Sequence, residues 1–294
     1  MPLNSPTLSN PRPCLYVVAT PIGNLADITL RAIDVLSRVD LIAAEDTRHT
    51  RRLLAAHDIE NKLISYHEYN EHQRTPQLIA RLEQGAAIAL VSNAGTPLVS
   101  DPGYRLVSQA VARDIPVIPI PGVSAAMAAL SVSGMPTDAF VFVGFPARKK
   151  NKRTQQLKHL AILSQTLIFY QAPLRMMSFL KELLALLGDR QAVLAREITK
   201  RHEEFIRGTL SHIHARLSER DAVKGECTLL VQGATGTARP DGKDLEVLLR
   251  AALNHADAPL GEIVKTLALE HHVNKNRLYE IALKIKNSED SSDC

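Results

Sequence analysis

Three segments of the chain combine glycine, proline and small polar residues in a way that suits ligand binding by the backbone. They span residues 20–24 (TPIGN), 92–103 (SNAGTPLVSDPG) and 119–126 (PIPGVSAA), and each lies at the end of a short apolar run. Glycine lets backbone N–H groups approach a ligand closely, although such segments also serve simply to turn a chain. Because the ends of parallel strands meet at one edge of a sheet, we favour a ligand site formed by all three.

Short sequence motifs argue against some ligands but do not identify the ligand of these segments. The dinucleotide fingerprint GxGxxG is absent, since only Gly23 follows the first apolar run, and the chain has no GxxxxGK[ST] phosphate loop. Glu45 and Asp46 end the second apolar run, where a dinucleotide-binding protein would hold a ribose hydroxyl, but without the glycines this signal is weak. The sequence therefore disfavours a nicotinamide cofactor or ATP.

A dense run of basic residues marks a second candidate interface. Five charges fall in six positions, at Arg148, Lys149, Lys150, Lys152 and Arg153. Such a run is usually a solvated loop. It follows the tripeptide GFP at the expected opening of a second domain, however, so we favour contact with RNA phosphates.

Cysteine and histidine spacing argues against metal binding. Cys14, Cys227 and Cys294 are odd in number and far apart, without a CxxC pair. We therefore expect neither a disulfide framework nor a zinc site, and a reducing cytosol fits this pattern. His271 and His272 lack a third ligand at metal spacing, so no metal is assigned.

The alternation of apolar and helical patterns predicts an α/β fold with two such domains. Over residues 14–134, short β-branched runs alternate with segments of helical spacing, which predicts a parallel sheet covered on both faces. Over 135–235, several strands follow one another without a long helix, which predicts a mixed sheet. A turn-rich linker then leads to a helical, helix-turn-helix-like domain over 244–288. We expect residues 1–13 to be a flexible lead-in.

The composition is that of a globular protein. Of the 294 residues, 45% are hydrophobic and 22% are charged, and the net charge is only +4. So small an excess of positive charge does not by itself imply a nucleic-acid partner. The uncharged stretch 115–137 holds four prolines, which would break a membrane-spanning helix. With no signal peptide in the lead-in, we expect a cytoplasmic protein without a membrane partner.

The chain also carries a series of motifs in the order of one known family. They are TPIGNLADITLRA, AAEDTRHT, NAGTPLVSDPG, PGVSAA, FYQAPLR and KGE, within residues 14–233. They resemble those of the tetrapyrrole-methylase-like superfamily of S-adenosylmethionine enzymes. More narrowly, they look like the bacterial 2′-O-ribose methyltransferases that modify a cytidine in the decoding region of small-subunit (16S) ribosomal RNA. The resemblance implies a homodimer that binds S-adenosylmethionine between its two α/β domains.

The resemblance also implies which residues contact the cofactor. By position they are Pro21, Asn93, Ala94, Gly95, Thr96, Pro97, Ser100, Asp101, Ser124 and Ala125, with Tyr170 and Ala195 from the second domain. The implied partner is small-subunit ribosomal RNA or the assembled small subunit. Arg175 and Lys200 would join the basic run in contacting it. Because only 4% of residues are aromatic, we expect recognition of RNA shape and backbone rather than base stacking.

Methylation of a ribose hydroxyl requires alignment of the two reactants and a base that takes the proton. Asp101, Glu45 and Glu226 are our candidates for catalytic groups. An alternative interpretation of Asp101 is that its Asp-Pro-Gly turn simply begins a helix. An alternative interpretation of Asp46 is that it is a helix N-cap. Further carboxylates and amines in the same motifs are Asp46, Glu197, Lys200 and Glu203.

Four positions depart from the family's pattern. Asn93, Gln171 and Leu174 stand where an Asp, a Glu and a His are usual, and Gln232 replaces another Glu. Asn and Gln keep the hydrogen-bonding shape of the acids but remove their charge. These departures motivate one competing function, an RNA-binding assembly factor that has lost turnover. Another is methylation of a tetrapyrrole, which the basic run and the helical tail disfavour.

Overall fold

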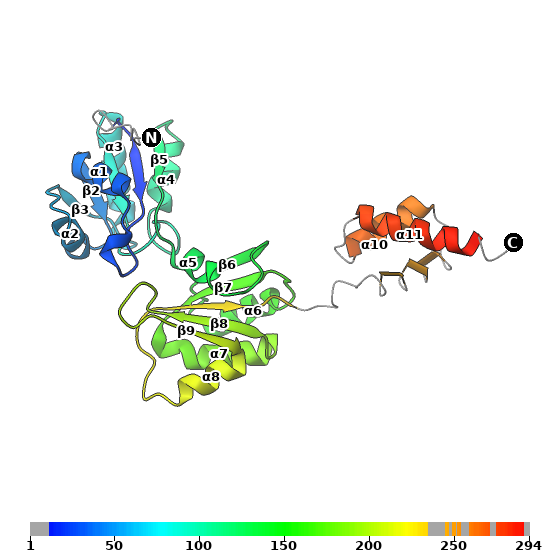
Figure 1. Ribbon diagram of the computed structural model, residues 1–294. Coiled ribbons are helices and arrows are strands. Elements are labelled where there is room, and N and C mark those ends of the chain that lie inside the picture. The colour runs from blue at the N-terminus through cyan, green and yellow to red at the C-terminus, as the bar shows by residue number, and fades with distance from the viewer. Residues whose placement is uncertain are drawn as a thin grey trace, which may run out of the picture. The chain divides into compact units, whose positions relative to one another are not determined.

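The computed structural model describes residues 12–234, 245–246, 249–250, 252–253, 259–270 and 275–290 (Figure 1). The contacts within the chain cluster into two compact units, Met1–Ala234 and Thr235–Cys294. The first unit contains two five-stranded sheets. Among the described helices, none is both long enough and apolar enough to cross a bilayer.

The first sheet has the order β3-β2-β4-β1-β5 and is parallel throughout. Its strands are β1 (Leu15–Val18), β2 (Leu41–Ala44), β3 (Leu63–Ser65), β4 (Ile88–Val91) and β5 (Val117–Ile120). The residues of β2 and β4 are buried throughout, as continuous apolar strands in a parallel sheet should be. The predicted parallel sheet is thus confirmed.

Helices cover both faces of this sheet. On one face lie α1 (Leu30–Arg38) and α2 (Thr47–Ala55), and on the other lie α3 (Glu71–Glu83) and α4 (Tyr104–Val111). A short 3₁₀ helix, η1 (Leu25–Asp27), precedes α1. The first pair of helices packs on side chains such as Tyr16 and Ile42, and the second pair packs on side chains such as Leu15 and Leu90. These contacts follow the alternation of side chains along a strand.

The second sheet is mixed, as predicted, with the order β6-β7-β10-β8-β9. Strands β6 and β7 are parallel and every other pair is antiparallel. The strands are β6 (Phe140–Gly144), β7 (Thr166–Gln171), β8 (Gln191–Arg196), β9 (Glu204–Thr209) and β10 (Cys227–Val231).

Helix α5 (Ala125–Ser131) connects the two sheets. Although it follows β5 of the first sheet, its buried Ala129 and Leu130 pack on one face of the second sheet, against Ile168 and Val193. The opposite face is covered by α6 (Lys150–Leu160), α7 (Pro173–Leu187) and α8 (Leu210–Ser218). The segment that ends the first sheet is therefore held directly by the second.

The second unit is described in part, by α10 (Leu260–Glu270) and α11 (Lys275–Asp290). These two helices pack together through a small apolar cluster that includes Val264, Leu278 and Ala282. The residues joining them, including His271 and His272, lie outside the described residues. The helix-turn-helix geometry of this tail therefore stays a prediction.

Candidate functional site

Three neighbouring strands of the first sheet end at the same edge, and each is followed by one of the glycine- and proline-rich segments. We call these segments the first loop (20–24), the second loop (92–103) and the third loop (119–126); they follow β1, β4 and β5. Thr20 and Gly95 exchange two backbone hydrogen bonds of 2.9 Å, which join the first and second loops. Thr96 Oγ1 donates to Val123 O over 3.3 Å, which joins the second and third. The three loops therefore form one continuous wall.

A cavity of about 400 Å³ lies against this wall, and we call it the loop cavity. Nine of the predicted cofactor contacts line it, namely Asn93, Ala94, Gly95, Thr96, Ser100, Asp101, Ser124, Ala125 and Tyr170. The candidate catalytic residues Glu45 and Glu226 line it as well as Asp101. The structure thus brings together residues that are widely separated in the sequence.

Three of the predicted cofactor contacts lie elsewhere. Pro21 lines an adjacent cavity, and Pro97 lines neither. Tyr170, Thr228 and Ala195 form a row across β7, β10 and β8. Tyr170 and Thr228 line the loop cavity, whereas Ala195 is fully buried in the cluster under α5. Ala195 therefore packs in the apolar cluster between α5 and the second sheet.

The second domain contributes several lining residues that the sequence analysis did not single out. Phe145, Ala172, Pro173, Cys227 and Thr228 all line the loop cavity. Tyr170 ties this wall to the third loop, because its hydroxyl accepts a hydrogen bond of 3.2 Å from the backbone N–H of Ala126. Burial raises the pKa of Tyr170, so this phenol stays neutral at physiological pH. Thr228 could have been found from the register of β7 and β10, because that register places it beside Tyr170.

Asn93 offers a buried hydrogen-bond acceptor at the loop cavity. Its backbone N–H donates to Glu45 Oε2 over 3.0 Å, which holds the start of the second loop. Its side-chain Oδ1 is buried and has no partner among the described residues. Because buried acceptors are nearly always paired, a ligand that donates a hydroxyl or amino hydrogen would complete this site. A nucleoside-type cofactor such as S-adenosylmethionine carries such donors, so the residues fit it.

Several residues near the loop cavity adopt a strained backbone conformation. Leu98 and Ser100 in the second loop have φ of 71° and 70°, and Glu197 and Thr199 between β8 and β9 have φ of 52° and 67°. Each left-handed non-glycine residue costs about 1–2 kcal/mol. Strain of this kind gathers at functional sites, where the surrounding structure holds a required geometry.

Asp101 has the electrostatic properties of a general base. Burial raises the pKa of its carboxyl from 3.8 to about 6, a hydrogen bond from Ser92 offsets part of this increase, and the negative charge of Glu45 adds to it. A base works best when its pKa lies near the working pH and it can reach the proton. Asp101 combines such a pKa with a place in the cavity wall.

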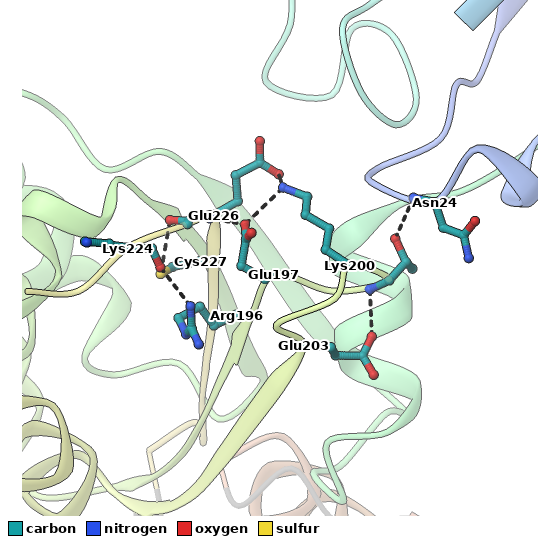
Figure 2. A network of polar contacts seen from close by, with 10 residues as sticks. Asn24, Arg196, Glu197, Lys200, Glu203, Lys224, Glu226 and Cys227 are labelled. Atoms are coloured by element: carbon teal, nitrogen blue, oxygen red, sulfur yellow. Dashed lines mark hydrogen bonds and ion pairs between the residues drawn. The ribbon is translucent and has the colours of Figure 1, made fainter. Parts of the chain in front are cut away.

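Lys200 bridges two carboxylates, those of Glu197 and Glu226 (Figure 2). Its Nζ donates to Glu197 Oε1 and to Glu226 Oε2, each over 3.0 Å, and the Glu226 backbone N–H donates to the same Glu197 oxygen over 2.9 Å. Burial acts to lower the pKa of Lys200, but the hydrogen bonds to Glu226 and Glu197 outweigh it and raise that pKa. Lys200 therefore stays protonated and cannot serve as the base. We call these three residues the Lys200 network.

Two glycines make room for the Lys200 network. A Cβ at Gly23 would collide with the Lys200 side chain, and a Cβ at Gly225 would collide with that of Glu197. Beside Gly23, the Asn24 backbone N–H donates to Thr199 Oγ1 over 3.2 Å (Figure 2). The β8–β9 connection of the second sheet therefore rests on the first loop of the first sheet.

Comparison with known proteins identifies the family of this chain. A sequence model of the tetrapyrrole (corrin/porphyrin) methylases matches residues 14–214. The chain belongs to this family. It is also 46% identical over 266 residues to the Ribosomal RNA small subunit methyltransferase I of Micromonospora olivasterospora, covering 90% of this chain and 85% of that protein. The protein of that name from Vibrio cholerae is 44% identical over 280 residues, covering 95% of this chain and 97% of that protein. Within the family, the chain belongs to the small subunit methyltransferase I group.

Solved structures of tetrapyrrole methylases share the fold of this family member. Uroporphyrin-III-C-methyltransferase from Thermus thermophilus aligns with a TM-score of 0.55 and 19% identity, over 74% of this chain and 93% of that one. The methyltransferase CobJ aligns with a TM-score of 0.57 and 17% identity, over 75% of this chain and 94% of that one. A further structure of the Thermus enzyme, complexed with S-adenyl homocysteine, aligns with a TM-score of 0.53 and 20% identity, over 74% of this chain and 96% of that one.

The remaining base candidates of this methylase-family chain have structural roles. Asp46 caps α2 by accepting from the Arg48 backbone N–H over 2.8 Å, and hydrogen bonds from Arg48 lower its pKa to about 2. Glu203 accepts the Thr199 backbone N–H over 2.6 Å and so closes the turn after β8. The N-cap interpretation of Asp46 is confirmed.

The basic run of this family member lies across the start of α6. Arg148, Lys149, Lys150 and Lys152 are exposed, and none of their side chains forms a hydrogen bond in the described part of the chain. Arg153 differs, because it binds both carboxylate oxygens of Glu182 at 2.7 Å and donates to the carbonyls of residues 147 and 148. Arg153 therefore anchors the run, and its charge is already paired.

The two other predicted RNA contacts differ from each other. Arg175 is exposed on α7, where its side chain is accessible. Lys200 is held between two carboxylates, so it is poorly placed to bind a phosphate. Whether any of the predicted residues touches RNA stays a prediction.

Proposed function

We propose that this chain uses S-adenosylmethionine to methylate the ribose 2′-oxygen of a cytidine in the decoding region of small-subunit ribosomal RNA. The main support is the loop cavity, whose lining includes both a carboxyl of raised pKa, Asp101, and a residue with an unpaired buried acceptor, Asn93. Relatives that are 44–46% identical over most of the chain carry the name Ribosomal RNA small subunit methyltransferase I. The exposed basic run supplies a surface for the RNA backbone.

The residues of the loop cavity would hold the cofactor from two sides. Asn93 Oδ1 would accept a hydrogen bond from it, and the backbone of the second loop would line its length. Tyr170 and Thr228 would form the opposite wall. When bound, S-adenosylmethionine supplies a methyl group on a positively charged sulfur. The aromatic pair Phe145 and Tyr170, with ring centroids 5.7 Å apart, would exclude water from this wall.

Asp101 would take the proton as the new bond forms. As the ribose 2′-oxygen accepts the methyl group that the bound cofactor would supply, its hydroxyl proton would pass to the Asp101 carboxylate. Glu45 holds the second loop through Asn93, and its negative charge adds to burial, the main cause of the raised pKa of Asp101. Alignment by the three loops supplies most of the acceleration in this scheme, since proton transfer contributes a smaller factor.

Transfer of labelled methyl from S-adenosylmethionine to small ribosomal subunits that lack decoding-site ribose methylation tests the proposal. We expect label on a single 2′-oxygen, located by nuclease digestion of the RNA. Cofactor binding by calorimetry without any label would favour the RNA-binding assembly factor. No cofactor binding would discard the cofactor assignment.

Restoring the family's usual residues distinguishes the enzyme from an inactive factor. We expect the triple variant Asn93→Asp, Gln171→Glu, Leu174→His to change the transfer rate by less than about tenfold, equivalent to about 1.4 kcal/mol of barrier. The reason is that the backbone N–H of residue 93 donates a hydrogen bond to Glu45, and the variant keeps this N–H. If the wild type is inactive and the triple variant is active in the same assay, the chain is a factor that has lost turnover.

The four unpaired basic residues predict a salt-dependent interaction with the subunit. We expect the quadruple alanine variant of Arg148, Lys149, Lys150 and Lys152 to bind small subunits more weakly. We also expect its dependence on salt to be shallower, by about 0.7–0.9 in log–log slope for each phosphate that the variant no longer binds. Affinity for S-adenosylmethionine should not change. Lys158→Ala, an exposed charge at the other end of α6, is the control; an equal loss in that variant would contradict the assignment.

We further propose that the enzyme acts as a homodimer on the assembled small subunit. Three apolar side chains support an interface on α5 and its flanks, since Met127, Val132 and Phe140 are 43%, 49% and 38% exposed. Contiguous exposed apolar side chains often mark protein interfaces. Light scattering should give twice the mass of one chain, and a monomer mass would reject this part of the proposal.

A further inference from the structure

A second cavity, of about 380 Å³, lies next to the loop cavity, and the function proposed above does not use it. We call it the α2 cavity, because His49, Arg52 and Leu53 of that helix line it. Ile22, Asn93, Ala94 and Glu226 line both cavities, so the two share a wall. A ligand in either cavity therefore comes within reach of the same residues.

The lining of the α2 cavity combines polar and charged side chains with an exposed apolar side chain. His49 and Arg52 are exposed, and their side chains have no hydrogen bond or ion pair within the described part of the chain. Leu25, directly after the first loop, is 48% exposed and lines the same cavity. The Lys200 network contributes Lys200 and Glu226 to the same lining.

We propose that the α2 cavity receives the target nucleoside of the RNA, an inference that rests on the function proposed above. A methyl transfer takes place between two bound molecules, the donor and the acceptor. Their two binding cavities must therefore meet at the reacting atoms. A nucleotide held in a stacked helix cannot reach an enclosed site and has to be turned out of the stack. The α2 cavity lies in the size range of sites that enclose small molecules, and Leu25 offers an apolar contact for a base or a sugar.

The charges around the α2 cavity determine which side of it the phosphate of the target nucleotide occupies and which side the ribose occupies. The Lys200 network holds two carboxylates and one ammonium, so its net charge is −1 and it repels phosphate. Arg52, on the α2 side of the cavity, attracts phosphate. The phosphate of the target nucleotide therefore binds on the α2 side. Its ribose faces the shared wall, so that the 2′-hydroxyl is directed toward the loop cavity that Asp101 lines.

Neighbouring arginines on one helix provide a matched test. Arg52 lines the α2 cavity, whereas Arg51 lines a separate hollow near Asp58 and Asn61. With small subunits that lack the decoding-site methylation, we expect Arg52→Ala to raise the KM for the subunit by about tenfold or more, since it removes a charge-assisted hydrogen bond. The Kd for S-adenosylmethionine, measured by calorimetry, should stay within about twofold. Arg51→Ala should match the wild type in both constants, and equal melting temperatures should show that all three proteins are folded.

The outcomes separate this inference from the proposed function. Equal KM values for Arg52→Ala and Arg51→Ala, with an active wild type, would overturn the inference and leave the methyltransferase assignment intact. A changed cofactor Kd for Arg52→Ala would also overturn it, because the cavity would then belong to the cofactor. An inactive wild type would instead reject the function itself. In that case, a porphyrin precursor whose absorbance changes on mixing with the wild type but not with Arg52→Ala would assign the α2 cavity to a tetrapyrrole.

Discussion

Replacing Asp101 with Asn should lower methyl transfer by about 10²–10⁴-fold, the usual contribution of a positioned general base. The substitution keeps the size of the side chain and removes its ability to take a proton. Binding of S-adenosylmethionine should persist, because the loops that form the cavity are held by backbone contacts between Thr20 and Gly95. Single-turnover transfer to small subunits measures the loss. Asp221→Asn, an exposed aspartate after α8, is the matched control and should leave the rate unchanged.

The same substitution should make the protein more stable at neutral pH. The pKa of Asp101 is about 6 in the folded protein, above its ordinary value of 3.8, because burial disfavours the charged carboxylate. The stability that this group contributes is therefore fully present below pH 3.8 and is lost as the pH rises through about 6. Asn cannot ionise, so the variant avoids this loss at neutral pH.

Two measurements follow from the sign of this pKa shift. Wild-type transfer should decrease as the pH falls through about 6, because the base becomes protonated. Urea unfolding should show Asp101→Asn to be more stable than the wild type at pH values above 6 and equal to it below 3.8. A variant that is inactive and less stable at neutral pH would show that Asp101 serves the fold rather than the chemistry.

Replacing Lys200 with Met should lower transfer by about 100-fold, the loss expected from a misplacement of about 1 Å near the reacting atoms. Met keeps the apolar stem that packs on Gly23 but removes the ammonium that binds Glu197 and Glu226. The two carboxylates would then repel each other at short range, and Glu226 would leave the wall that the two cavities share. Steady-state kinetics with small subunits should show the effect.

A second substitution tests how Lys200 acts. Repulsion between Glu197 and Glu226 should lower the melting temperature of Lys200→Met. The double variant Lys200→Met, Glu226→Gln lacks this repulsion, so its melting temperature should be higher than that of Lys200→Met. Transfer should stay low, because no ammonium holds residue 226. Recovery of both properties would mean that the Lys200 network only stabilises the fold. A melting temperature that does not recover would mean that repulsion between Glu197 and Glu226 is not the cause.

Much of the fold could be predicted from local sequence patterns. The continuous apolar runs at 41–44 and 88–91 predict strands buried on both faces, and the structure contains them as β2 and β4. The position of the three loops at one edge follows from parallel strands, because their carboxyl ends must lie together. Asp101 was identified as a candidate because it lies in one of those loops.

The parts that could not be predicted depend on contacts between distant residues. Arg153 looks like its neighbours in the sequence, yet Glu182 on another helix neutralises it. Ala195 and Thr228 lie side by side in the second sheet, but only the overlying α5 determines which of them faces the loop cavity. Likewise, no local pattern indicates that Lys200 lies on Gly23, 177 positions earlier in the printed sequence.

The left-handed residues around the loop cavity have a consequence for protein engineering. Leu98, Ser100, Glu197 and Thr199 would each lose strain if replaced by glycine. A screen for thermostable variants that reads only melting temperature would therefore favour glycine at the exposed Ser100. At the other three positions, glycine would also remove the core packing of Leu98, the bonds of Glu197 in the Lys200 network, or the bond from Asn24 to Thr199. Glycine at residue 100 would loosen the second loop, which lines the loop cavity. Heat-resistant variants should therefore be screened for methyl transfer as well as for melting temperature.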